Sequence, residues 1–153
     1  MEILHISAEC YPVAKVGGLA DVVGALPIYQ NALGSRSRVL MPYYDIAFMQ
    51  NNTFKEVYNS TIKFGYGFID FKVLTLKENT LDFDIIFIDI PELLFEKQVY
   101  AEDDTERFLA FQIAALDLIV QLKKKPEIIH CHDYHSGLIP FMMSQCHDYK
   151  ILQ

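Results

Sequence analysis

The chain has 153 residues, of which 52% are hydrophobic and 22% charged, so it suits one domain with a buried core. Its 13 basic and 20 acidic residues give a formal net charge of −7, which argues against a nucleic-acid binder, because such proteins usually carry a basic surface. No run of eighteen or more apolar residues occurs, so we expect no membrane partner.

The cysteines and the opening residues indicate the compartment. Three cysteines are too few and too scattered for a disulfide framework, and an odd number suits a reducing environment. The opening residues do not resemble a signal peptide, because the acidic Glu2 precedes only a short apolar run. We therefore expect a cytoplasmic protein.

The first quarter of the chain predicts a strand, a loop and a helix. Residues 3–6 are a short apolar run typical of a buried strand, and residues 9–18 are rich in proline and glycine and predict a loop. From 19 to 33 apolar residues recur at spacings of three and four, which predicts a helix that Gly34 ends. Pro27 lies inside this helix, and we expect it to kink the helix or limit its regularity.

The middle of the chain predicts further strands. Residues 38–41 form an apolar run before a proline and predict the second strand. Apolar and aromatic residues are dense from 61 to 76, and Gly65 and Gly67 interrupt them. Their alternation with polar residues predicts a half-buried strand in an antiparallel hairpin. Residues 83–90 are almost continuously apolar and predict another buried strand.

The next helix has recognisable signals at both ends. Asp103 or Asp104 can cap its first turn, and Asp103 is spaced to pair with Arg107 one turn later. The helix continues to the lysines at 123–125, whose positive charges complement the helix dipole. We therefore interpret this basic run as a helix end and not as a phosphate-binding patch.

The last part predicts a strand at 128–131, a turn at 132–137, a helix at about 138–146 and the opening of one more strand at 150–153. Strands that alternate with helices indicate an α/β fold with a mostly parallel sheet covered on both faces, and the middle hairpin adds an antiparallel portion. Functional loops of such sheets gather at the carboxyl ends of the strands. We therefore expect the loop at 10–18 and the turn at 132–137 to meet at one edge.

The first of these loops has the features of an anion site. Gly17 and Gly18 stand between a strand and a helix, where backbone amides can approach a ligand at the positive helix end, and Lys15 adds a full charge. This combination suits a phosphate or a diphosphate. It matches neither the dinucleotide nor the Walker fingerprint, and a plain tight turn that begins a helix remains an equal alternative.

The second loop contains His130, His132 and His135 within six residues. Strand alternation puts His130 and His132 on one side, and such imidazoles can donate to sugar hydroxyls or phosphate oxygens. Asp133 can orient an imidazole or cap the following helix. The spacing matches no zinc pattern, so we expect no metal and no cofactor. We interpret His5 as a core or edge histidine.

The sequence resembles a known family in three places, in the family's order along the chain. Residues 3–9 read ILHISAE, residues 15–27 read KVGGLADVVGALP, and residues 130–140 read HCHDYHSGLIP. These segments resemble bacterial glycogen synthases and plant starch synthases. The resemblance implies a retaining glucosyltransferase of the GT-B type, built from two Rossmann-like domains. Such enzymes transfer glucose from ADP-glucose to the non-reducing end of an α-1,4-glucan such as glycogen.

The resemblance also assigns roles to residues. Lys15 would contact the donor diphosphate, with the Gly17 and Gly18 amides beside it. His132 would face the transferring glucose, supported by two residues of its own turn. The implied catalytic set is His132, Asp133, His135 and Asp21.

The resemblance predicts that residues 1–153 are the N-terminal, acceptor-side domain of a longer chain. The family's nucleotide pocket, diphosphate clamp and essential glutamate would lie in a C-terminal domain that is absent here. We therefore expect this chain alone to bind little donor and to transfer no glucose. Two alternatives stay open: a non-catalytic module that binds glucan or phosphate, and a GT-B enzyme that uses a UDP-sugar.

Overall fold

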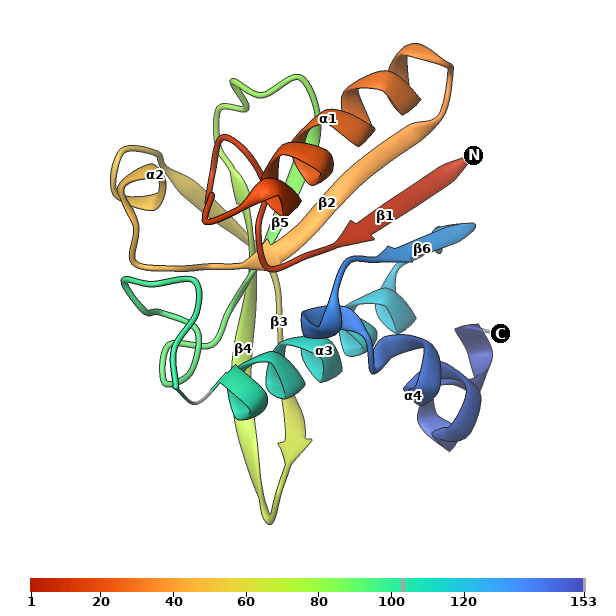
Figure 1. Ribbon diagram of the computed structural model, residues 1–153. Coiled ribbons are helices and arrows are strands. Elements are labelled where there is room, and N and C mark those ends of the chain that lie inside the picture. The colour runs from red at the N-terminus through yellow and green to blue at the C-terminus, as the bar shows by residue number, and fades with distance from the viewer. Residues whose placement is uncertain (103, 153) are drawn as a thin grey trace.

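The structure is a computed structural model that describes residues 1–102 and 104–152 (Figure 1). Its centre is a sheet of six strands, which are β1 (Glu2–Ile6), β2 (Arg36–Pro42), β3 (Phe54–Phe64), β4 (Gly67–Leu76), β5 (Asp84–Asp89) and β6 (Ile128–Cys131). Their order across the sheet is β3-β4-β5-β2-β1-β6. Neighbours among β5, β2, β1 and β6 are parallel, whereas β3, β4 and β5 pair antiparallel. The expected α/β fold with a mostly parallel sheet and an antiparallel hairpin is confirmed.

Helices cover both faces of this sheet. They are α1 (Gly18–Ala32), α2 (Ala47–Gln50), α3 (Asp104–Gln121) and α4 (Ile139–Gln145), with two 3-10 helices, η1 (Tyr134–Ser136) and η2 (His147–Leu152). The helix α1 connects β1 to β2 on one side of the sheet, and α3 connects β5 to β6 on the other (Figure 1). All five residues of β1 are therefore buried, as expected of a central parallel strand.

The helix α1 extends through Pro27, which is buried inside it, and ends at Ala32. A proline removes one backbone hydrogen-bond donor, but α1 is nevertheless continuous through this position. Gly34 follows at φ 87°, a left-handed conformation that glycine adopts without steric cost, and its amide donates to the Asn31 carbonyl. Gly34 therefore follows the end of the helix as the sequence predicted.

The hairpin shows the predicted alternation but is longer than predicted. Along β4, Phe71 and Val73 are buried, whereas Asp70 and Lys72, which alternate with them, are exposed. The strand β3 begins already at Phe54, a start that the sequence analysis missed. Most side chains of its first half are exposed or half-buried, so no apolar alternation marks it.

The buried Arg107 ties the start of α3 to the preceding loop. It pairs with Asp104 at 2.7 Å and donates to the Leu93 carbonyl at 2.8 Å. The predicted partner, Asp103, lies outside the described residues. At the far end Lys125 donates to two carbonyls near the helix terminus, which agrees with the helix-end interpretation of the basic run.

The expected strand at 150–153 is wrong for the described residues, because His147–Leu152 form η2. Tyr149 and Leu152 are partly buried against the core. Residues three apart lie on one side of a 3-10 helix, so this spacing lets both side chains pack on the core.

Candidate functional site

Two loops leave the sheet side by side at the carboxyl ends of β1 and β6. These strands are parallel neighbours with Ile6 opposite Cys131, and just beyond them the His132 amide donates to the Ile6 carbonyl at 3.0 Å. β2 pairs with the other edge of β1, so the order of strands changes direction between β1 and β6. Ligands of open α/β sheets bind at such a switch point. The expectation that the two loops meet at one edge is confirmed.

The first loop is organised by Glu9, which is almost fully buried. Its Oε2 atom accepts hydrogen bonds from the amides of Val16 at 2.6 Å and of Gly17 at 2.9 Å. Burial alone would raise the pKa of Glu9, but hydrogen bonds from Tyr100 and from these amides outweigh it and lower the pKa. Glu9 is therefore a carboxylate at neutral pH. It already holds the Gly17 amide that the resemblance assigned to a diphosphate.

The two glycines face open space. A Cβ atom added at Gly17 or Gly18 would meet no other atom within 4 Å. Gly17 also has an extended backbone with φ −139°. Neither packing within this chain nor backbone conformation thus requires glycine here, and the surface beside both residues has room for a ligand.

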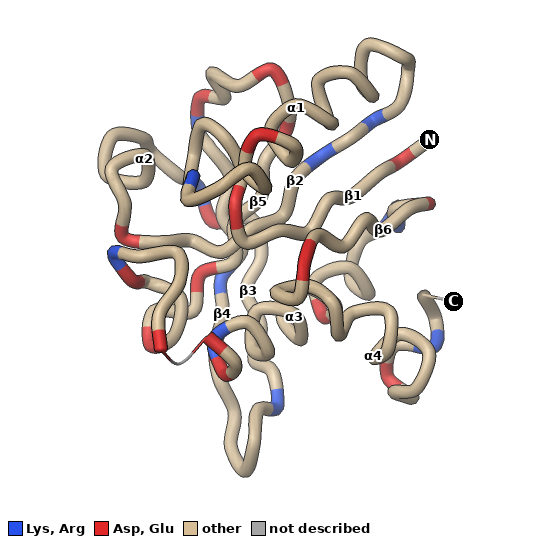
Figure 2. Tube along the Cα trace, in the orientation of Figure 1, with Lys and Arg blue, Asp and Glu red and all other residues tan. Residues whose placement is uncertain are grey.

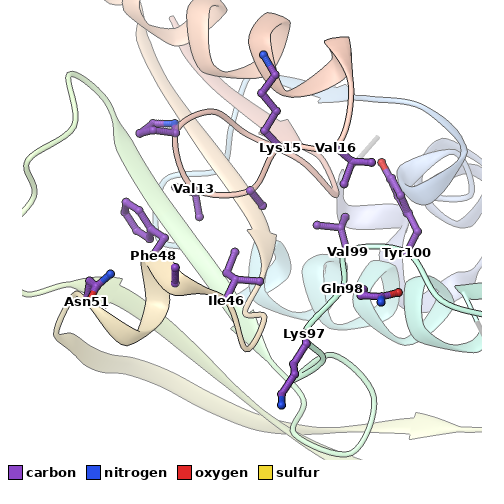
Figure 3. A pocket seen from close by; sticks show the side chains of 13 residues that line it. Val13, Lys15, Val16, Ile46, Phe48, Asn51, Lys97, Gln98, Val99 and Tyr100 are labelled. Carbon is purple, nitrogen blue, oxygen red and sulfur yellow. The ribbon is translucent and has the colours of Figure 1, made fainter.

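Lys15 and Asp21, both predicted to act at the site, form an ion pair with each other. The Lys15 Nζ atom lies 2.7 and 2.8 Å from the two carboxylate oxygens of Asp21, and both side chains are about half exposed. Lys15 accordingly points toward α1, as Figure 3 shows. Exposed pairs of this kind contribute little to stability, so an anionic ligand can compete for the lysine.

The histidine turn has an unusual backbone at Asp133. Its φ of 61° is the one positive value among the described residues other than glycine. The Asp133 carboxylate accepts from the Tyr134 amide at 2.7 Å and so caps η1. Ser136 donates to the His132 carbonyl at 2.9 Å and closes the turn from the other side. Of the two roles suggested for Asp133, the structure shows the capping one.

His135 is buried in an aromatic sandwich. Its ring stacks on Tyr100 with 4.8 Å between centroids and meets Phe108 edge-on at 4.6 Å. Neither ring nitrogen has a hydrogen-bond partner among the described residues, and burial lowers the pKa of His135. The Tyr100 hydroxyl donates to Glu9, so Tyr100 joins the histidine turn to the first loop.

The other imidazoles of the turn stack with His5 from β1. The rings of His130 and His132 lie 4.1 Å apart, which shows them on one side as predicted, and His5 lies about equally far from both. His5 Nδ1 is 2.9 Å from His132 Nε2, and His5 Nε2 is 2.8 Å from Gln30 Oε1. Burial, together with the neighbouring His130 and His5, lowers the pKa of His132 to about 4. His132 is therefore a neutral imidazole at neutral pH.

A cavity of about 650 Å³ lies beside this site (Figure 3). Three segments line it, namely residues 12–16 of the first loop, 46–51 around α2, and 97–100. Its volume is in the range of small-molecule pockets, and its walls combine aliphatic side chains with a few polar ones, as such pockets usually do. It adjoins the candidate site through Val16 and Tyr100, whereas no residue of the histidine turn lines it.

Comparison with known proteins decides the family. A family model described as "Starch synthase catalytic domain" matches residues 2–153. The chain belongs to this family.

Relatives within the family are named glycogen synthases. The chain is 51% identical to a glycogen synthase of Flavobacterium johnsoniae over 154 aligned positions, which cover all of this chain and 33% of that protein. It is 37% identical to a glycogen synthase of Streptococcus agalactiae over 95% of this chain and 30% of that protein. The chain thus spans about a third of the length of these relatives.

A solved structure of the family has the same fold. The catalytic domain of starch synthase IV from Arabidopsis thaliana, bound to ADP and acarbose, matches with a TM-score of 0.86 and 30% identity. The match covers 97% of this chain and 31% of that one. The sheet described above therefore corresponds to one part of a GT-B catalytic domain.

Two residues of the site have an importance that the sequence did not show. Glu9 lies in the first segment that resembles the family and Tyr100 lies outside the three segments, and no role was predicted for either. Each is a single polar residue in a loop, and their hydrogen bond forms across 91 positions of sequence. No local pattern of sequence identifies a partner so far away.

Along the described Cα trace, lysine and arginine are scattered among acidic residues (Figure 2). Within the described part of the chain no helix combines the length and the apolar character needed to cross a membrane.

Proposed function

We propose that a full-length family member carrying this chain transfers glucose from ADP-glucose to the non-reducing end of an α-1,4-glucan such as glycogen, with retention, in the cytoplasm. This chain supplies the acceptor-side part of the active site. Membership of the starch synthase catalytic domain family supports the reaction class. The pairing of Ile6 with Cys131 supports the site, because it brings the Lys15 loop and the His132 turn to the same edge of the sheet.

The electrostatics of the two loops favour different parts of a sugar nucleotide. Lys15 carries a half-exposed positive charge beside the open surface at Gly18, where the helix begins, and this suits a diphosphate. His132 is neutral because burial lowers its pKa to about 4, so it suits a sugar hydroxyl better than a phosphate. The donor would thus lie with its diphosphate at the first loop and its glucose at the histidine turn.

Asp133 and His135 act in this proposal by shaping the turn that holds His132. Asp133 caps η1, and His135 fixes the turn against Tyr100 and Phe108. Asp21 holds Lys15 in reach of the site until a diphosphate replaces its carboxylate. The nucleotide itself would bind to a C-terminal domain, since this chain spans about a third of its relatives. We therefore propose that the 153-residue chain alone transfers no glucose.

The test compares donors and chain lengths in one assay. Labelled glucose is offered to glycogen as ADP-glucose or UDP-glucose, with the full-length protein and with the 153-residue chain in parallel. We expect incorporation from ADP-glucose by the full-length protein only, and release of the label by an α-1,4-specific amylase. Preference for UDP-glucose would instead favour a UDP-sugar enzyme. Glycogen binding without incorporation from either donor would favour a non-catalytic module.

A further inference from the structure

Three imidazoles converge where β1 and β6 run side by side. His5 is the register partner of His130 in the parallel pair, and His132 follows two residues later. Neighbours across parallel strands and residues two apart share a face, so all three rings project to the same side. Each ring offers one nitrogen as a ligand atom, and these three nitrogens all lie within 4.8 Å of one another.

We propose that His5, His130 and His132 form a binding site for a divalent transition metal of the zinc, cobalt and nickel class. Imidazole nitrogen suits these ions, and a three-histidine site leaves a fourth position for water. Metal–nitrogen bonds of about 2.0–2.1 Å would place the nitrogens about 3.3 Å apart in a tetrahedral site. The Nδ1 atom of His5 and the Nε2 atom of His132, which lie 2.9 Å apart, must therefore move slightly apart. The widest separation between the three ligand nitrogens, at most 4.8 Å, must shorten.

The cluster can make this adjustment because its members differ in freedom. His5 is fully buried and His132 nearly so, which limits these two ligands to the shift of a few tenths of an ångström that opens their 2.9 Å contact. His130 lies exposed on β6, the edge strand of the described sheet, so its side chain can rotate toward them. The same exposure gives solvent access to the fourth coordination position.

A second shell for His5 is already present. Gln30 Oε1 lies 2.8 Å from His5 Nε2 and also accepts from the Ser37 hydroxyl at 2.6 Å. This acceptor holds the proton on Nε2 and leaves the lone pair of Nδ1 directed at His132. Metal-binding histidines commonly donate their second nitrogen to an oxygen in this way.

Sequence spacing argued against a metal because it considered the histidine turn alone. His5 lies 127 positions before His132 and reaches it only through the pairing of β1 with β6. No local motif can report a ligand supplied in this way.

The test uses zinc and cobalt ions with the 153-residue chain, without any sugar nucleotide. Calorimetry should show one zinc ion per chain, and cobalt should give the absorption of a four-coordinate site without a thiolate charge-transfer band. His130→Ala should weaken zinc binding at least about tenfold, because even second-shell changes cost that much. His130 is exposed, so this variant should keep its fold, which circular dichroism checks. Gln30→Leu should weaken binding about tenfold through the second shell.

The matched control is His147→Ala, whose imidazole is 93% exposed and belongs to η2, outside the cluster. It should bind zinc like the unmodified chain. Equal affinity in His130→Ala and the unmodified chain would overturn the proposal. Loss of binding in His147→Ala, or a thiolate band with cobalt, would also overturn it. The proposed metal and the proposed glucose would compete for His132, and because no donor or glucan is present in this test, its outcomes do not depend on the glucosyl transfer.

Discussion

The Tyr100 hydroxyl donates to Glu9 Oε1, and this hydrogen bond joins two loops whose residues are 91 positions apart. The other oxygen of Glu9 holds the amides of Val16 and Gly17, while the Tyr100 ring stacks on His135. A continuous set of contacts therefore runs from the glycine loop to the histidine turn. This connection adds to the pairing of β1 with β6 in setting the relative position of the two loops.

Tyr100→Phe tests this connection. The substitution keeps the ring on His135 but removes a donor from the buried Glu9 carboxylate, so we expect the free energy of unfolding to fall by about 1–3 kcal/mol. Urea unfolding at pH 7 measures the change. The control is Tyr66→Phe in the exposed hairpin turn, expected within about 0.5 kcal/mol of the unmodified chain. Equal stability of both variants would show that the Glu9 contact does not support the fold.

The acid sensitivity of the fold should depend on Glu9. Its pKa is lowered in the folded state, so the unfolded chain binds the proton more readily. The stabilisation from this group is complete above its unfolded pKa of about 4.3 and is lost as the pH falls through the lower folded pKa. Thermal unfolding between pH 3 and 7 should thus show a shallower acid loss in Glu9→Gln than in the unmodified chain. Parallel curves for the two proteins would contradict the lowered pKa.

Gly24 should be the glycine of α1 that the fold requires. A Cβ atom there would lie 2.4 Å from the Tyr11 carbonyl oxygen, which is backbone and cannot move freely. Gly24→Ala should therefore lower the free energy of unfolding by about 1–3 kcal/mol. Gly18→Ala, where the added carbon meets nothing within 4 Å, is the matched control and should stay within about 0.5 kcal/mol. Denaturant unfolding of both variants measures the contrast, and similar losses in both would refute it.

Local patterns were enough to predict much of the fold. Apolar runs indicated β1, β2, β5 and β6, and glycine positions indicated the hairpin turn and the end of α1. They failed where packing overrides pattern. The mostly solvent-facing first half of β3 carries no apolar alternation. The end of the chain was expected to open a strand, but Tyr149 and Leu152 pack on the core with the spacing of three that the 3-10 helix η2 gives.

The candidate site could be predicted in outline only. Parallel strands put their following loops at one edge, so the meeting of the Lys15 loop and the His132 turn followed from strand order. The partners of these residues did not follow, because they depend on register across the sheet. His5 reaches His132 through the pairing of β1 with β6, and Tyr100 reaches Glu9 from a distant loop.

Lys15→Gln separates a role in donor binding from a role in stability. In the full-length protein we expect kcat/KM for ADP-glucose to fall by about tenfold to a hundredfold, because a charge-assisted contact to a diphosphate is worth about 1.5–3 kcal/mol. Stability should change by less than about 1 kcal/mol, since the pair with Asp21 is half exposed. Lys97→Gln is the control, because Lys97 lies on the opposite wall of the cavity and points away from it (Figure 3). An equal loss of kcat/KM in both variants would show a general effect of charge and remove Lys15 from the proposed donor site.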